Sequence, residues 1–149
     1  MSVSEICHRE VIAMQKDECV LEAARLMRKH HVGDVVIVAK QKGIQKPIGI
    51  VTDRDLVVEV MATELDPAVI TVGDIMQPGL ATIKENADIF EVIRYMRRKA
   101  VRRIPVISDN EQLVGIVTLD DLLQLLSQEL SGLVKLVERE IGKEIQQRP

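Results

Sequence analysis

The chain has 149 residues, 46% of them hydrophobic and 29% charged, and its formal net charge is −3. This composition is typical of a soluble globular chain that is long enough to bury a core, as one compact domain or as two closely packed halves. Two cysteines do not make a disulfide framework, no early basic stretch precedes an apolar run, and acidic residues interrupt every apolar stretch of membrane-spanning length. We therefore expect a cytoplasmic protein with no signal peptide and no membrane span.

Each half of the chain begins with a short apolar segment, residues 11–14 or residues 80–83, that we expect to form a strand. A helix is expected next, because apolar residues recur at i, i+3, i+4 and i+7 starting from Val20 and again from Ile89. The aligned N-cap candidates of these two helices are Asp17 and Asn86.

A β-hairpin is expected after each helix, followed by a second helix that begins at Asp53 or Leu119. Each half is therefore β-α-β-β-α, and its continuous apolar strands need cover on both faces or against the other half. The hairpin strands are residues 35–38 and 48–51 in the first half, and residues 104–107 and 113–117 in the second.

The two halves are repeats of one another. The string Gly-Ile-Val-Thr at residues 49–52 returns at residues 115–118, while the offset upstream is three residues larger because the first half has a longer turn between its hairpin strands. The expected organisation is repeat 1 at residues 3–65, a linker at 66–71, repeat 2 at 72–130 and a C-terminal extension at 131–149.

Each copy of the string places a Thr at the end of a strand and an Asp three residues later, Thr52 with Asp55 and Thr118 with Asp121. A helix start carries unpaired N–H donors and partial positive charge, which attract phosphate. An ionised carboxylate there can also accept two hydroxyl hydrogen bonds from a ribose diol. The same pattern is a capping box, in which the carboxylate returns to the helix's own N–H groups, and the two roles can coexist.

These segments resemble cystathionine-β-synthase (CBS) domains, which occur as tandem pairs forming one module. The resemblance rests on residues 32–38 with 47–56 and on residues 101–106 with 113–122. It implies an α+β fold of two β-α-β-β-α repeats packed sheet to sheet with pseudo-two-fold symmetry, and a homodimer. In the family, the Gly-h-x-Thr-x-x-Asp element, where h is hydrophobic, binds the ribose and phosphate of adenosine nucleotides or S-adenosylmethionine.

The resemblance implies three groups of site residues. Because repeat 1 has Gly33 and Asp34 where repeat 2 has an Arg pair that could hold phosphate, we expect one good site and one weaker or empty site. The expected residues are Thr52, Asp53, Arg54, Asp55, Thr118, Asp120 and Asp121 for ribose and phosphate, Arg102 and Arg103 for phosphate, and Val11, Ile12, Ala13, Leu80, Ala81, Thr82, Ile104 and Pro105 for the base.

Residues 94–103 carry six cations and no acid, which makes nucleic-acid binding the competing class of function. The net acidic charge, the presence of only Phe90 and Tyr95 as stacking aromatics, and the buried side of this helix weigh against it. A solvated helix face and a contribution of Arg102 or Arg103 to a nucleotide site are the other interpretations.

The cysteines and histidines fit no metal-ligand spacing, and no nucleophile has a base beside it, so we expect neither a metal site nor an enzyme. We expect a non-catalytic regulatory module that binds AMP, ADP, ATP or S-adenosylmethionine between its repeats and signals to an effector protein that the sequence does not identify. The alternatives are a nucleic-acid-binding protein and a purely structural dimerisation protein.

The extension keeps helical spacing of apolar residues from Leu130 to Ile145, with charged residues at the other positions. This amphipathic helix either packs back onto its own domain or forms a seam between subunits. We favour the seam, because so apolar a stripe needs cover.

Overall fold

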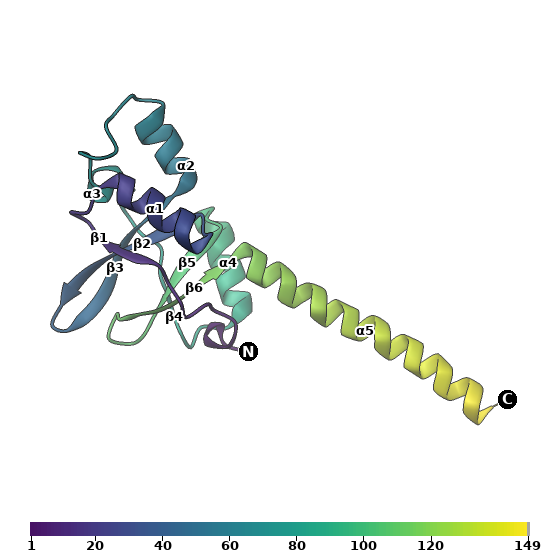
Figure 1. Ribbon diagram of the computed structural model, residues 1–149. Helices are drawn as coiled ribbons and strands as arrows, with labels where there is room; N and C mark the ends of the chain where they lie inside the picture. The colour runs from purple at the N-terminus through teal and green to yellow at the C-terminus, as the bar shows by residue number, and fades with distance from the viewer. Residues whose placement is uncertain (149) are drawn as a thin grey trace.

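The computed structural model describes residues 1–148 and contains two three-stranded sheets, one from each repeat (Figure 1). In each sheet the first strand runs parallel to the second, and the second and third form an antiparallel hairpin. The expected α+β fold of two repeats is confirmed. The strands are β1 (Ala13–Gln15), β2 (Asp34–Gln41) and β3 (Ile44–Thr52) in the first sheet, and β4 (Ile83–Lys84), β5 (Arg103–Ile107) and β6 (Leu113–Thr118) in the second.

The helices also follow the repeat. Within residues 1–148, no helix is both long and apolar enough to cross a bilayer. The long helix α5 runs without a break through residue 130, where the second repeat was expected to end. The helical elements are η1 (Val3–Glu5), α1 (Val20–His30), α2 (Asp53–Asp55) with the π-helix η2 (Leu56–Met61), α3 (Val72–Ile75), α4 (Ile89–Lys99) and α5 (Leu119–Gln147).

The helices α1 and α4 begin later than their sequence suggests. Their N-caps are Cys19 and Asp88, so the predicted caps Asp17 and Asn86 are wrong by two residues. An antiparallel bridge to the segment that precedes the other repeat holds each cap residue in extended backbone. At α1 the long-range bridge outweighs local capping preference, because Cys19 makes no side-chain cap bond, whereas Asp88 of α4 also caps locally by accepting from the Phe90 N–H at 3.0 Å.

The first strand of each sheet is also shifted toward the C-terminus relative to the predicted segments 11–14 and 80–83. Parallel pairing begins only at Ala13, opposite Val36, and at Ile83, opposite Val106. The Ile12 carbonyl still accepts from the Val36 N–H at 2.9 Å, so the residues just before Ala13 run along the edge of the sheet, where Val11 and Ile12 also line a cavity.

Each repeat has its own buried core, which a segment of the other repeat completes. The core of repeat 1 includes Val72 and Ile75 of α3, and the core of repeat 2 includes Val3 of η1. Val3 and Val72 are 0% exposed, and burying such a side chain contributes about 1.5–3 kcal/mol. Because these segments are exchanged, neither repeat closes its core alone.

The two sheets face each other through a third cluster, formed by Val36, Val38 and Ile116. A Cβ on Gly115 would lie 2.7 Å from Cys7 Sγ, and a Cβ on the equivalent Gly49 would lie similarly close to a methionine sulfur. The group that approaches each of these strand glycines is the chain's own segment before a first strand, Cys7 before β1 and Met76 before β4.

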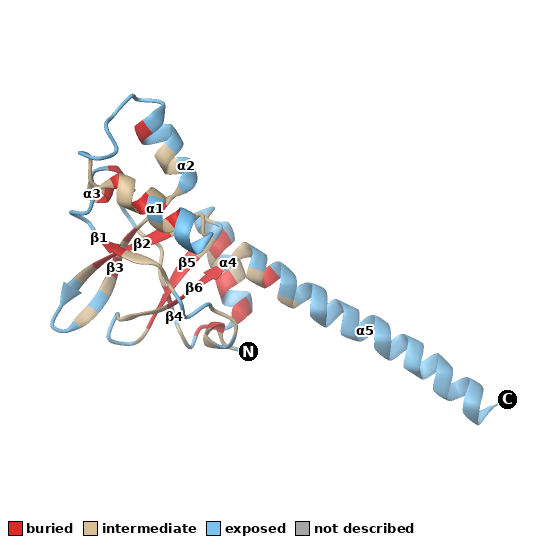
Figure 2. Cartoon of the chain, in the orientation of Figure 1, coloured by how far each residue is buried: buried red, intermediate tan, exposed pale blue. Residues whose placement is uncertain are grey.

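Helix α5 leaves the body of the protein and projects away from it (Figure 1). Its first turns are partly covered, whereas every residue from 127 to 148 is exposed (Figure 2). The interpretation that the tail packs back onto its own domain is therefore wrong beyond Leu126.

Candidate functional site

The two repeated motifs form matching strand-to-helix junctions. Strand β3 ends at Thr52 and α2 begins at the next residue, while β6 ends at Thr118 and α5 begins at the next residue. Both threonines have extended backbone, which ends the strand and lets the side-chain oxygen turn back over the first helical turn.

Both junctions contain a complete capping box. The Thr52 N–H donates to Asp55 Oδ2 at 2.8 Å, and the Asp55 N–H donates to Thr52 Oγ1 at 3.2 Å. The corresponding distances between Thr118 and Asp121 are 2.9 and 3.2 Å. The capping interpretation is thus correct for both copies, and it engages only one carboxylate oxygen of each aspartate.

The remaining carboxylate oxygens differ. Asp121 Oδ1 lies 2.7 Å from Nε2 of His8, a side chain that is 64% exposed. Within residues 1–148, no hydrogen bond or ion pair reaches Asp55 Oδ1. A ligand hydroxyl would therefore meet a free oxygen on Asp55 but would have to displace the imidazole of His8 from Asp121.

A cavity of about 410 Å³ lies beside the second junction and is lined by both repeats. Thr118 and Ile116 of repeat 2 form one side, and Val11 and Ile12, which precede β1, form another. The polar residues at its walls are His8, Arg9, Glu10 and Asp34. We call this cavity, with Thr118 and Asp121, the second seat.

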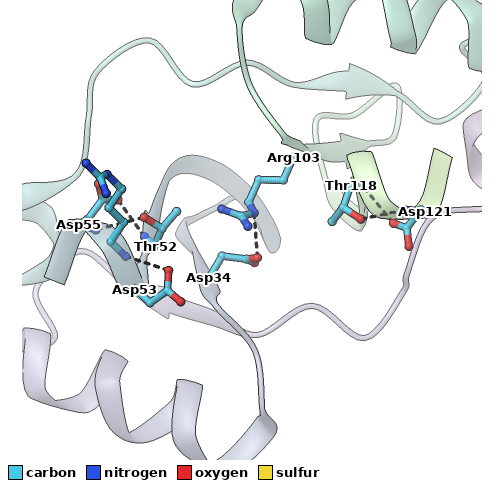
Figure 3. Close-up of polar contacts among 8 residues, drawn as sticks. Asp34, Thr52, Asp53, Asp55, Arg103, Thr118 and Asp121 are labelled. Carbon is cyan, nitrogen blue, oxygen red and sulfur yellow. Dashed lines mark hydrogen bonds and ion pairs between the residues drawn. The ribbon is translucent and has the colours of Figure 1, made fainter. Parts of the chain in front are cut away.

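Asp34 and Arg103 meet between the two junctions (Figure 3). Arg103 Nε lies 3.1 Å from Asp34 Oδ2, but its N–H is not directed at the carboxylate, so the buried Nε has no hydrogen-bond partner among residues 1–148. The two residues are repeat equivalents at the offset of 69 that relates the upstream halves. Their contact therefore lies at the pseudo-two-fold axis.

The charged form of the Asp34 carboxyl is disfavoured despite this ion pair. Burial raises the pKa of Asp34, the guanidinium of Arg103 lowers it, and the carboxylate of Asp53 raises it further, which leaves the pKa above its ordinary value. The cation is therefore only a partial compensation for the loss of water around this acid.

The remaining predicted phosphate residues do not gather in one place. Arg54 and Asp120 are exposed on the first turns of their helices. Arg102 lines a separate apolar groove between α4 and α5, and its carbonyl accepts from the Leu119 N–H at 2.7 Å. Of the two arginines in the predicted pair, only Arg103 points toward the cleft between the repeats (Figure 3).

The predicted base-slot residues are also divided. Ala13 packs against the cluster between the sheets, and Leu80 and Ala81 precede β4 outside the cavity of the second seat. Thr82 lines a different groove beside α4. Ile104 and Pro105 are fully buried within β5, so their side chains are not exposed to a ligand in the cleft.

The sequence of each repeat matches a known protein family. The CBS domain model matches residues 3–62 and residues 72–128, one match for each repeat. The chain belongs to the CBS domain family. It is a tandem CBS pair followed by the projecting part of α5.

Relatives of this CBS pair include one protein of similar size and one that is longer. Hypoxic response protein 1 of Mycobacterium tuberculosis is 35% identical over 118 residues, which are 79% of this chain and 80% of that protein. Uncharacterized protein MK0525 of Methanopyrus kandleri is 39% identical over 125 residues, which are 84% of this chain but 62% of that longer protein.

Solved structures share the same fold. The CBS domain pair of protein MJ0100, in complex with 5'-methylthioadenosine and S-adenosyl-L-methionine, has a TM-score of 0.75 and 26% identity, over 87% of this chain and 98% of that chain. A crystal structure of Hypoxic Response Protein I with two coordinated zinc ions has a TM-score of 0.73 and 33% identity, over 83% of this chain and 98% of that chain. In the part of this CBS pair that the structure describes, no three His, Cys, Asp or Glu side chains group to hold a metal ion.

The cationic run at residues 94–103 does not form one basic face. Arg98 and Lys99 lie over the ring of Tyr95, at 5.1 and 5.9 Å from its centroid. Arg97 lines the apolar groove between α4 and α5, and Arg103 pairs with Asp34. The charges are thus directed to different neighbours, an arrangement that does not resemble a continuous phosphate-binding track.

Sequence reasoning missed two features of the second seat. His8 was considered only as a metal ligand, and Asp34 was contrasted with the arginine pair without the contact that joins it to Arg103. The contact between Asp34 and Arg103 could have been found from the repeat alignment, because the two residues are repeat equivalents and equivalent residues near a pseudo-two-fold axis can touch. Nothing in the local sequence around His8 predicts its bond to Asp121.

Proposed function

We propose that this CBS pair is a non-catalytic regulatory module that binds an adenosine-containing ligand between its repeats. The observation that carries the proposal is the cavity that joins Thr118 of repeat 2 to Val11 and Ile12 of repeat 1. Its apolar wall suits a purine, and the adjacent Asp121 can accept ribose hydroxyls once the imidazole of His8 moves away. The complex of MJ0100 with two adenosyl compounds supports this ligand class.

The first seat follows from the repeat symmetry. We define it as Thr52 and Asp55 with the repeat equivalents of the second-seat wall, which are Leu80, Ala81 and Arg103. Where the second seat has the acid Asp34, the first seat has the cation Arg103. The adjacent Arg54 adds a further positive charge at the same junction.

The opposite charges favour different ligands in the two seats. A phosphate-bearing nucleotide such as AMP, ADP or ATP fits the first seat, because a guanidinium and a helix start both favour phosphate. The second seat has Glu10 and Asp34 at its walls, while the guanidinium of the lining residue Arg9 donates to the Ser4 carbonyl at 3.1 Å. The two acids favour an adenosyl group without phosphate or with a cation, such as S-adenosylmethionine.

Binding in either seat would bridge the two repeats and change the relative stability of their arrangements. A ligand that binds one arrangement more tightly shifts the population toward it, and an effector protein that recognises this arrangement then responds. We propose this as the regulatory mechanism, with the homodimer as the unit that responds.

A ligand panel read by thermal unfolding tests this function. The panel contains AMP, ADP, ATP, S-adenosylmethionine and 5'-methylthioadenosine, each also tested on an Asp55→Ala, Asp121→Ala double variant. At about one hundred times its dissociation constant, a ligand that binds only the folded chain adds about 2.7 kcal/mol of stability. A shift with at least one ligand that the double variant loses is expected. No shift with any ligand would favour the purely structural alternative and contradict the proposal.

A further inference from the structure

The projecting part of α5 presents large apolar side chains to solvent. Nine of them on this helix are exposed, from Leu126 at 40% to Ile145 at 65%. They are Leu123, Leu126, Leu130, Leu133, Val134, Leu136, Val137, Ile141 and Ile145. Monomeric proteins seldom leave a contiguous apolar strip of this length uncovered.

Seven of these residues follow a regular spacing along one face of the helix. From Leu123 the steps to successive residues are three, four, four, three, four and four, ending at Ile145. Two such eleven-residue repeats keep the stripe on one side of a nearly straight helix. The stripe can therefore contact another straight helix along its whole length.

The stripe continues into an apolar groove on the body of the protein. This groove, of about 330 Å³, lies between α4 and the first turns of α5, and Leu123 and Leu126 belong both to it and to the stripe. Arg97 and Arg102 line the groove and are exposed. The groove is thus an apolar surface with cations at its rim.

The charges on α5 are arranged to complement that rim. Near the C-terminal end, Glu138 and Glu140 flank the stripe and Arg139 lies on the opposite face at the helical period, while Glu144 pairs with Arg148 at 3.5 Å. A parallel pairing of two copies would bring both sets of glutamates together. An antiparallel pairing instead brings each set to the other copy's cationic groove.

We propose that α5 pairs antiparallel with α5 of a second copy, so that its C-terminal half occupies the groove between α4 and α5 of that copy. In this register Val134 lies near the two-fold axis, and Leu126 faces Ile141 of the other copy. Covering the stripe removes apolar surface on the scale of the roughly 800 Å² per partner that a specific interface buries. This inference does not depend on the proposed ligand binding.

Particle mass in solution tests the interface, measured by light scattering on the full chain. Val134→Glu with Val137→Glu should halve the mass of the wild-type particle, because it places charges in the centre of the stripe. Gln128→Glu with Gln146→Glu adds the same charge on the opposite face and should leave the mass unchanged. Circular dichroism checks that both variants keep the fold, which is expected because every residue from 127 to 148 is exposed.

Disulfide trapping tests the direction of the pairing in a Cys7→Ser, Cys19→Ser background. Chains with Leu126→Cys are mixed with differently tagged chains carrying Ile141→Cys and then oxidised. The expected product is the mixed disulfide. A Leu126→Cys homodisulfide would show parallel helices and overturn the proposal, as would a monomeric wild-type chain, a particle mass that survives the stripe variant, or equal dissociation of the control variant.

Discussion

The first and second seats share one motif and one capping geometry, but they differ in the side chains that the other repeat supplies. In the second seat the imidazole of His8 contacts Oδ1 of Asp121, and Asp34 lies at the cavity wall. In the first seat Asp55 has a carboxylate oxygen with no such partner within residues 1–148, and the equivalent of Asp34 is Arg103. Duplication thus preserved the local backbone of each junction, whereas the residues across the cleft diverged.

The largest expected effect comes from removing the aspartate of one seat. Asp121→Ala should weaken the binding of S-adenosylmethionine about 100-fold. The loss of hydrogen bonds from the ribose hydroxyls to a charged acceptor costs about 3 kcal/mol of binding free energy in total. Calorimetric titration gives the affinity directly.

The control for this variant is Asp74→Ala. Thr71 and Asp74 form the same kind of capping box, with distances of 3.0 and 3.2 Å, but they do not line the second seat. The control should lose a cap and keep the affinity. An equal loss of affinity in both variants would show that Asp121 acts through helix stability alone.

A smaller effect of opposite sign is expected from His8→Ala. The variant frees Asp121 Oδ1, so S-adenosylmethionine should bind about fivefold more tightly, since an exposed side-chain contact of this kind contributes at most about 1 kcal/mol. The repeat equivalent Gln77→Ala is the matched control and should change nothing. Weaker binding to the His8 variant would mean that the imidazole contacts the ligand and does not compete with it.

Asp34→Asn should change the ligand affinities of the two seats in opposite directions, each by about threefold. The first seat should bind AMP more tightly, because Arg103 loses its ionic partner, and the second seat should bind the cationic S-adenosylmethionine less tightly. Titrations with 5'-methylthioadenosine, which has neither charge, provide the control. Parallel changes for AMP and S-adenosylmethionine would refute the opposite-charge comparison.

The raised pKa of Asp34 also has a consequence for stability. Because the folded chain holds the proton of the Asp34 carboxyl more tightly than the unfolded chain does, protonation of Asp34 stabilises the fold. This stabilisation is fully present below the ordinary aspartate pKa and is lost as the pH rises through the raised pKa of the folded state. Relative to Asp34→Asn, the wild-type chain should therefore lose stability as the pH rises across this range. Urea unfolding at a series of pH values measures this difference, and an opposite slope would show that the ion pair with Arg103 outweighs burial.

Much of the fold could be predicted because the repeat is written in local patterns. Apolar periodicity placed α1 and α4, and the end of each Gly-Ile-Val-Thr string marked where a helix begins. The capping boxes were predictable for the same reason, since Thr and Asp three residues apart interact within one helical turn.

The features that could not be predicted depend on contacts between distant segments. The start of α1 lies at Cys19, which pairs with the segment that leads into the other repeat. The bond between His8 and Asp121 joins residues 113 positions apart. The burial of Ile104 and Pro105 likewise depends on how the sheets pack. No local pattern specifies such contacts, so the residues of a junction are predictable while the residues that face it are not.

The most direct test of unequal seats is a calorimetric comparison of AMP and S-adenosylmethionine on the wild-type chain, Asp55→Ala and Asp121→Ala. We predict that Asp55→Ala weakens AMP binding about 100-fold and leaves S-adenosylmethionine binding unchanged, and that Asp121→Ala does the reverse. Loss of both ligands in the same single variant, or equal weakening by both variants, would contradict a cleft with two seats of different charge.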